Sequence, residues 1–153
     1  VIDNLPRAYG APDDIEARAH MMSAAAMGAT AFQKGLGAIH AMSHPVGAVF
    51  NTHHGTTNAV CMPAVLALNA PAIRDRFDRA APYLGIEGGF DGFCAFVQEF
   101  NDRFGIPRRL GEMGVSADRM DDLVAMAMND PSCGGNPVPL TADNLRSLFG
   151  SCI

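Results

Sequence analysis

The sequence predicts an all-α fold, an irregular bundle of about seven helices that forms one domain over residues 1–153. Apolar residues recur at helical spacing along most of the chain, and the alternation typical of strands is nearly absent. Hydrophobic residues make up 48% of the chain, which is enough to bury a core. Charged residues make up only 18%, below the roughly 25% usual in soluble proteins. This balance favours extensive burial, or a surface that another element covers.

The expected helices, in chain order, cover about 12–32, a segment with His40 and His44, about 55–68, 71–84, 90–104, 117–128 and 142–149. Pro12 and the acidic pair Asp13–Asp14 suit a first helical turn and its positive dipole end. We expect the second helix to be kinked at Pro45, because proline removes a backbone donor.

The later helices have a polar face, an apolar stripe or a capping residue. In the segment 71–84 the charged residues share a wet face, and in the segment 90–104 phenylalanines recur at the spacing of a buried helix stripe. Ser116 and Thr141 are expected to cap the last two helices.

Composition excludes several classes of protein. A net charge of −5 argues against nucleic acid, which selects basic surfaces. The four cysteines show no zinc or disulfide spacing, so we expect free thiols and a cytoplasmic location. No signal-peptide pattern opens the chain. The segment Gly35–Ile73 has no formal charge, but histidines, prolines and glycines interrupt it, so we expect no membrane span.

Four of the five histidines lie within this uncharged segment. His40 and His44 are four residues apart, which places both on one helix face. His54 follows at the expected start of the next helix, where the dipole favours a neutral imidazole, the form that binds metal. Two of these histidines could share a divalent ion while a third carries a proton. The alternative is a set of core histidines bonded to backbone carbonyls. Because a catalytic metal usually has three or four protein ligands, the remaining ones must come from elsewhere.

Two glycine-containing stretches leave alternatives open. Gly35-Leu36-Gly37 could be a helix stop with a tight turn, or a close backbone approach to a flat ligand ring. Lys34 beside it is interpreted as an ordinary solvated lysine. The loop Pro131–Pro137 could be a plain connector, or it could line a pocket.

The stretch GLGAIHAMSHPVGAVFNTHHGTTNAV resembles the signature of the iron-containing alcohol dehydrogenase family, also called group III. NLPRAYG, FQKGLG, LALNAP, GIPRRLGEMGV and SCGGNPVPLTADNLRSLF resemble further parts of that family's helical domain, in the same order. The resemblance implies the C-terminal domain of a dehydroquinate synthase-like fold. It further implies a longer enzyme, whose N-terminal nucleotide-binding domain is absent from this chain.

The resemblance assigns roles to individual residues. His40 and His54 correspond to two metal ligands of the family. His44 corresponds to a histidine near the nicotinamide and near the oxygen that the metal binds, and Gly37 is expected beside the cofactor. Phe32 and Cys133 fall in regions that border the substrate and nicotinamide pocket.

The chain also departs from the family pattern. Its members carry two further ligands in a D-x3-H arrangement, which precedes the region seen here. The pair Glu16 and His20 imitates that spacing, but it has the wrong acid and the wrong position, so we reject it as a ligand pair. His53 receives no ligand role.

The implied function is that of an oxidoreductase that interconverts an alcohol and an aldehyde or ketone by hydride transfer. Its implied cofactors are Fe(II) or Zn(II) together with NAD or NADP, and the full-length enzyme is expected to be a homodimer or larger. The alternatives are a metal-free or zinc-using relative, such as a maleylacetate reductase-like or glycerol dehydrogenase-like enzyme, and a non-catalytic helical module that binds a metal or a partner chain. We expect this chain alone to be inactive and to bind divalent metal weakly.

Overall fold

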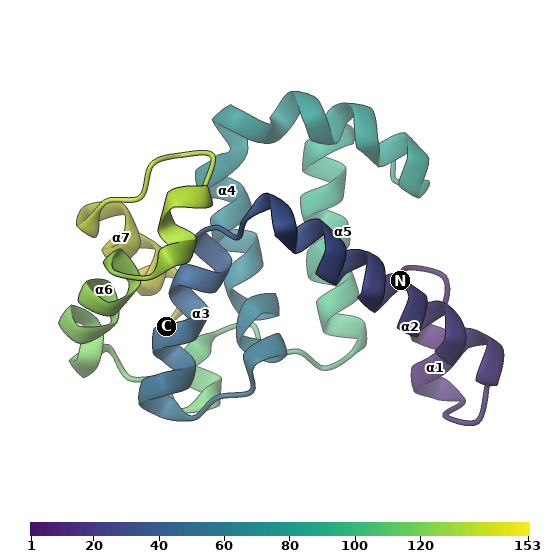
Figure 1. The fold of residues 1–153 in the computed structure, drawn as a ribbon, viewed down its shortest axis with the longest axis horizontal. Coiled ribbons are helices and arrows are strands. Elements are labelled where there is room, and N and C mark those ends of the chain that lie inside the picture. Colours follow the sequence, from purple (N-terminus) through teal and green to yellow (C-terminus); the bar gives the residue numbers. More distant parts are fainter. The chain divides into compact units, whose positions relative to one another are not determined.

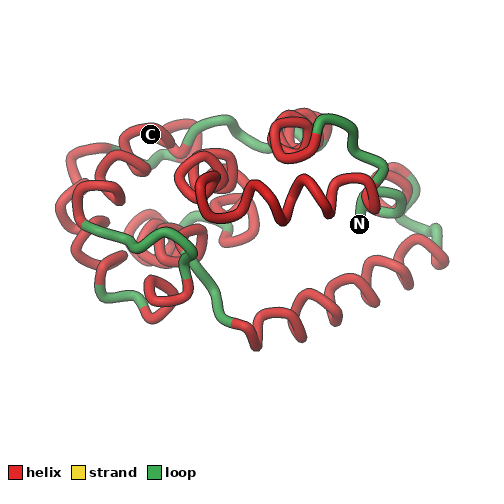
Figure 2. Tube along the Cα trace, turned by 90° about the horizontal axis from the view of Figure 1, so that it is seen from above, coloured by secondary structure: helices red, strands yellow, loops and turns green.

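The computed structural model describes all residues 1–153 and confirms the all-α class, with helices and loops but no strand (Figures 1 and 2). Its seven α-helices are α1 (Leu5–Gly10), α2 (Ile15–Ala31), α3 (Ala38–Phe50), α4 (His54–Ala80), α5 (Gly89–Arg103), α6 (Met120–Met128) and α7 (Ala142–Cys152). Five short 3-10 segments accompany them: η1 (Phe32–Lys34), η2 (Ala81–Leu84), η3 (Leu110–Met113), η4 (Ala117–Arg119) and η5 (Pro131–Gly135). The chain divides into two compact units, Val1–Gly35 and Leu36–Ile153.

The first unit contains α1, α2 and η1. The Asp14 carboxylate accepts a hydrogen bond from the Ala17 backbone N–H at 3.0 Å, so Asp14 is the N-cap of α2. Arg7 of α1 pairs with Asp14 and Glu16, each at 2.9 Å. Because Asp14 is its N-cap, helix α2 begins at Ile15, three residues later than the sequence predicts. Helix α1 was not predicted, because six residues are too few to show a periodic pattern.

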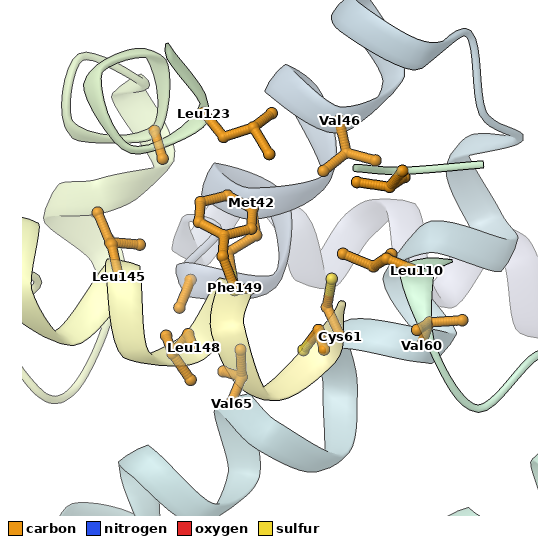
Figure 3. Close-up of a cluster of buried hydrophobic side chains, with 14 of the residues drawn as sticks. Met42, Val46, Val60, Cys61, Val65, Leu110, Leu123, Leu145, Leu148 and Phe149 are labelled. Carbon is orange, nitrogen blue, oxygen red and sulfur yellow. The ribbon is translucent and has the colours of Figure 1, made fainter. Parts of the chain in front are cut away.

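A large hydrophobic core fills the second unit between α3, α4, α6 and α7 (Figure 3). Met42 of α3 and Phe149 of α7 are fully buried at its centre, and Leu123 of α6 and Val65 of α4 close it from other sides. The thiol-bearing side chains of Cys61 and Cys152 also lie in this core, consistent with free cysteines. This core fixes α3 against α4, the two helices that carry the histidines.

Helix α4 is one continuous helix of 27 residues, where the sequence predicts two helices separated near Pro71. Tertiary contacts on both sides of the proline explain the difference. On one side, the amides of Asn69 and Asn136 exchange two hydrogen bonds, at 3.0 and 2.7 Å. On the other, Ile73 and Phe77 pack into a second apolar cluster with α5. Local propensity is a weak determinant of structure, and here packing overrides it.

The second apolar cluster joins the C-terminal half of α4 to α5. Phe90 is buried there, and the Phe77 ring contacts Phe90 and Phe93 at centroid distances of 5.8 and 4.6 Å. The helix predicted at 90–104 is observed as α5, Gly89–Arg103. The phenylalanine stripe is thus a packing surface.

The last two predicted caps have different outcomes. Thr141 forms a capping box with Asn144 at the start of α7, as expected for a helix beginning at Ala142. Ser116 accepts a hydrogen bond from the Asp118 backbone N–H, but the segment it caps is η4, and α6 starts only at Met120.

One helical stretch, His54–Leu84, is long and apolar enough to cross a membrane by length and composition alone. The core helix of a soluble protein passes the same test. In this structure α4 packs against α3, α5 and α7 and contributes to both apolar clusters.

Candidate metal centre

The tight turn between α3 and α4 brings the histidines together. Asn51 ends α3 in the left-handed conformation, with φ of 53°, a conformation that asparagine tolerates better than most residues. The buried Thr57 hydroxyl donates to the His53 carbonyl at 3.0 Å and lies 2.8 Å from the Thr52 hydroxyl, which ties the first turn of α4 to the connection. The chain reverses within three residues, and α4 returns alongside α3 (Figure 1).

His40, His44 and His54 form a compact triangle of imidazoles. The ring centroids are 5.6 Å apart for His40 and His44, 5.3 Å for His40 and His54, and 5.5 Å for His44 and His54. His40 is half-buried, whereas His44 and His54 are exposed. The structure therefore brings together the three histidines that the sequence singles out, on an open face of the second unit.

The Asn58 side chain shows that two of these rings converge on one point. Its amide nitrogen lies 3.1 Å from Nε2 of His54 and 3.4 Å from Nε2 of His40. An amide nitrogen can only donate hydrogen bonds, so both Nε2 atoms present lone pairs to it. The amide oxygen of Asn58 is buried and has no hydrogen-bond partner.

Electrostatics favour the neutral form of the innermost ring. Burial lowers the pKa of His40, and the neighbouring His54 and His44 lower it further, which outweighs the opposite effect of Asp130. A neutral imidazole keeps the lone pair that binds a metal ion.

Asp130 contacts the triangle from outside the histidine segment. Its Oδ2 lies 2.8 Å from Nδ1 of His44, and its Oδ1 accepts the Ser132 backbone N–H at 2.8 Å, capping η5. The side chain is 11% exposed. Burial alone would raise the pKa of the Asp130 carboxyl, but hydrogen bonds from His44 and Ser132 together hold it below its ordinary value. The group is therefore a carboxylate at neutral pH.

Gly37 is the N-cap of α3 and packs against the loop that follows α6. A Cβ at Gly37 would lie 3.0 Å from the Asn136 side-chain oxygen. That oxygen accepts the Ala38 backbone N–H at 3.1 Å, and the Asn136 amide nitrogen donates to the Val138 carbonyl at 2.7 Å. Close packing against Asn136 therefore explains why residue 37 is a glycine. The loop 131–137 also does more than connect two helices, since it anchors α3 and α4.

Cys133 lies in η5, next to Asp130. Its thiol donates to the Ala127 carbonyl with an S···O distance of 2.9 Å. Burial raises the pKa of this thiol, and the Asp130 charge raises it further, so the side chain is a protonated thiol at neutral pH.

The remaining predicted or rejected positions belong to other elements. Phe32 opens η1 in the first unit and is exposed. Glu16 and His20 belong to α2 of that unit as well, where Glu16 pairs with Arg7. His53 caps α4, because its Nδ1 accepts the Thr56 backbone N–H at 3.3 Å. Adjacent histidines therefore have separate tasks, with His53 capping a helix and His54 in the triangle.

No set of three or more His, Cys, Asp or Glu side chains is arranged to hold a metal ion by itself. A pocket of about 180 Å³ lies between α4, α5 and α7, where Ala59, Asn101 and Arg108 are among its lining residues. None of the predicted site residues lines it.

Two residues that contact the triangle, Asp130 and Asn58, were not predicted from the sequence. A signal existed for each. Asp130 directly precedes the Pro131 loop and is a good N-cap residue type, whereas Asn58 lies four residues after His54 and thus on the same helix face. Neither signal reveals that the side chain reaches a histidine.

Comparison with known proteins shows which family the chain resembles along its whole length. The model of the Fe-containing alcohol dehydrogenase family, C-terminal, matches residues 1–153. The chain is 39% identical to 4-hydroxybutyrate dehydrogenase of Cupriavidus necator, with 97% of this chain and 43% of that protein covered. It is 34% identical to NAD-dependent methanol dehydrogenase of Bacillus methanolicus, with 97% and 41% covered.

A crystal structure of 1,3-propanediol oxidoreductase superimposes with a TM-score of 0.92 at 27% identity, covering 99% of this chain and 42% of that one. The chain thus spans about two fifths of the length of the relatives it matches. The all-α fold predicted here is that of their helical region. The chain belongs to the Fe-containing alcohol dehydrogenase family, whose C-terminal domain it represents.

Proposed function

We propose that this chain is the C-terminal part of a metal-dependent, NAD(P)-linked dehydrogenase that interconverts an alcohol with an aldehyde or ketone. The observation that carries the proposal is the convergence of the His40 and His54 Nε2 atoms on a single point, marked by the Asn58 amide nitrogen. Membership of a family of alcohol dehydrogenases supports it, as do the names of the relatives.

The donor set fits a divalent cation such as Fe(II) or Zn(II). Imidazole nitrogen is a good ligand for both metals, and His40 and His54 already turn their lone pairs toward one positively polarised N–H group. When bound, the metal would supply Lewis acidity at the substrate oxygen. Two imidazoles make an incomplete site, and no third His, Cys, Asp or Glu side chain is arranged to complete it. We propose that the other ligands come from residues outside these 153.

His44 is proposed as the proton carrier. It shares the triangle with both proposed ligands, and its exposed ring is accessible to a substrate hydroxyl. A histidine is suited to accept and return a proton near neutral pH. In that role, Nε2 of His44 would accept the proton of the substrate hydroxyl when the alcohol is oxidised and return it in the reverse reaction.

The surroundings are proposed to position cofactor and substrate. Gly37 lies at the start of the helix that carries His40 and His44, and together with His44 it is the proposed nicotinamide contact. The protonated Cys133 thiol and the Phe32 ring are the proposed substrate-lining side chains, which exclude water and take no part in bond making.

The test uses the enzyme that contains this chain, purified with its metal. We expect about one Fe or Zn per chain by elemental analysis and NAD(P)-dependent oxidation of simple alcohols. His40→Ala and His54→Ala should each lose the metal and the activity, while the matched variant His53→Ala keeps both. Metal retained in both variants, or absent from an active wild-type enzyme, would contradict the proposal. Turnover by the 153-residue chain alone would contradict the proposal that its site is incomplete.

A further inference from the structure

The contact between Asp130 and His44 links two parts of the second unit that are distant in sequence. His44 lies in the middle of α3, and Asp130 lies between α6 and η5. The 2.8 Å separation of Nδ1 and Oδ2 is the distance of a charge-assisted hydrogen bond. Asp130 is also held from the other side, because its Oδ1 accepts the Ser132 backbone N–H.

The chemistry of the pair determines the position of the His44 proton. An ionised carboxylate can only accept hydrogen bonds, so the Nδ1 atom of His44 must donate. In the neutral ring the single N–H is then on Nδ1, and Nε2 keeps a lone pair. In water both tautomers of a neutral histidine are populated, and an imidazole with its proton on Nε2 could not accept a proton there.

We propose that Asp130 is a positioning residue that fixes His44 in the Nδ1–H tautomer and so makes its Nε2 the proton acceptor. The carboxylate acts through the histidine and touches no reacting atom. The tautomer stands on the contact itself, whereas its use in catalysis rests on the proposed function.

His53, the N-cap of α4, provides an internal reference with the opposite tautomer. Its Nδ1 accepts the Thr56 backbone N–H, so its own proton must be on Nε2. The same protein therefore contains two histidines whose surroundings dictate opposite tautomers.

Nitrogen-15 NMR of histidine-labelled protein tests the proposal, under alkaline conditions in which imidazoles are neutral. We expect protonated Nδ1 for His44 and protonated Nε2 for His53. In Asp130→Asn the side-chain oxygen can keep the Ser132 cap, which leaves the amide nitrogen to donate to Nδ1 of His44 and to move the ring proton to Nε2. His53 should be unchanged in that variant. A wild-type His44 protonated on Nε2, or a tautomer that Asp130→Asn leaves unaltered, would overturn the proposal.

A double-mutant cycle in the enzyme that contains this chain separates positioning from folding. Asp130→Asn should lower kcat by about 100-fold or more, and it should cost almost nothing further when His44 is already alanine. An equal loss in both backgrounds would assign Asp130 a merely structural role. If the enzyme lacks dehydrogenase activity but shows the expected tautomers, the proposed function fails and the tautomer assignment stands.

Discussion

The two ends of α4 use polar groups in different ways. At its C-terminal end, Arg74 pairs with Asp91 at 2.8 Å, and Asp78 accepts the Phe90 backbone N–H at 2.7 Å, beside a cluster of phenylalanine rings. At its N-terminal end, two imidazole nitrogens share one weak amide donor, and the Asn58 oxygen has no partner. Satisfied polar groups stabilise a fold, whereas a buried polar atom without a partner, such as the Asn58 oxygen, needs an explanation beyond stability. The difference separates the structural end of this helix from its proposed functional end.

The largest expected effect on stability comes from truncating a phenylalanine in each of the two apolar clusters that α4 joins. Phe149→Ala and Phe90→Ala should each lower the free energy of unfolding by about 3–5 kcal/mol. The Phe149 variant should be at the upper limit, because that ring is 0% exposed within the larger cluster, whereas Phe90 belongs to a cluster with few buried members. Urea denaturation of both variants measures the difference, and a larger loss for Phe90→Ala would reverse the ranking.

Alanine substitutions at two glycines test whether a backbone clash near one end of α4 leaves the other end undisturbed. A Cβ at Gly135 would strike the Leu36 carbonyl just before α3, and one at Gly92 would strike the Glu87 carbonyl before α5. Alanine at either site should cost about 1–3 kcal/mol, because a backbone segment must move. Only Gly135→Ala should shift the NMR signals of His40 and His44. Equal shifts in Gly92→Ala would mean that the two ends are not independent.

The smallest effect concerns His53, the neighbour of a proposed ligand. His53→Ala removes the side-chain acceptor for the Thr56 backbone N–H and should cost about 1 kcal/mol, the usual value for a lost N-cap. Thermal or urea denaturation measures this loss. His54→Ala removes no cap, so its stability should change less, and the opposite order would argue against the separation of roles.

The sequence was sufficient for those features that depend on neighbours along the chain. The spacing of His40 and His44 places them on one face of α3, and Thr141 caps α7, as local rules predict. The helix boundary predicted near Pro71 was wrong. The proline is a local signal for a helix stop, whereas the contacts that keep α4 continuous are tertiary.

The features that sequence could not supply depend on distant contacts. Asp130 meets His44 across 86 residues of chain, and no periodic pattern encodes that distance. Asn136 likewise contacts Ala38 and Asn69, which lie 98 and 67 residues away along the chain. The histidine signature predicted the residue types of the site, but the carboxylate that orients one of them became visible only in three dimensions.

Titration of the histidine-labelled 153-residue protein with Zn(II), followed by nitrogen-15 NMR, tests most directly whether His40 and His54 share one ion. If they share one ion, the Nε2 signals of both residues should move together to a single 1:1 end point, with weak affinity, while His53 is unaffected. His54→Ala should abolish the response of His40. Separate responses at different Zn(II) concentrations, or a His40 response that survives in His54→Ala, would contradict the shared site.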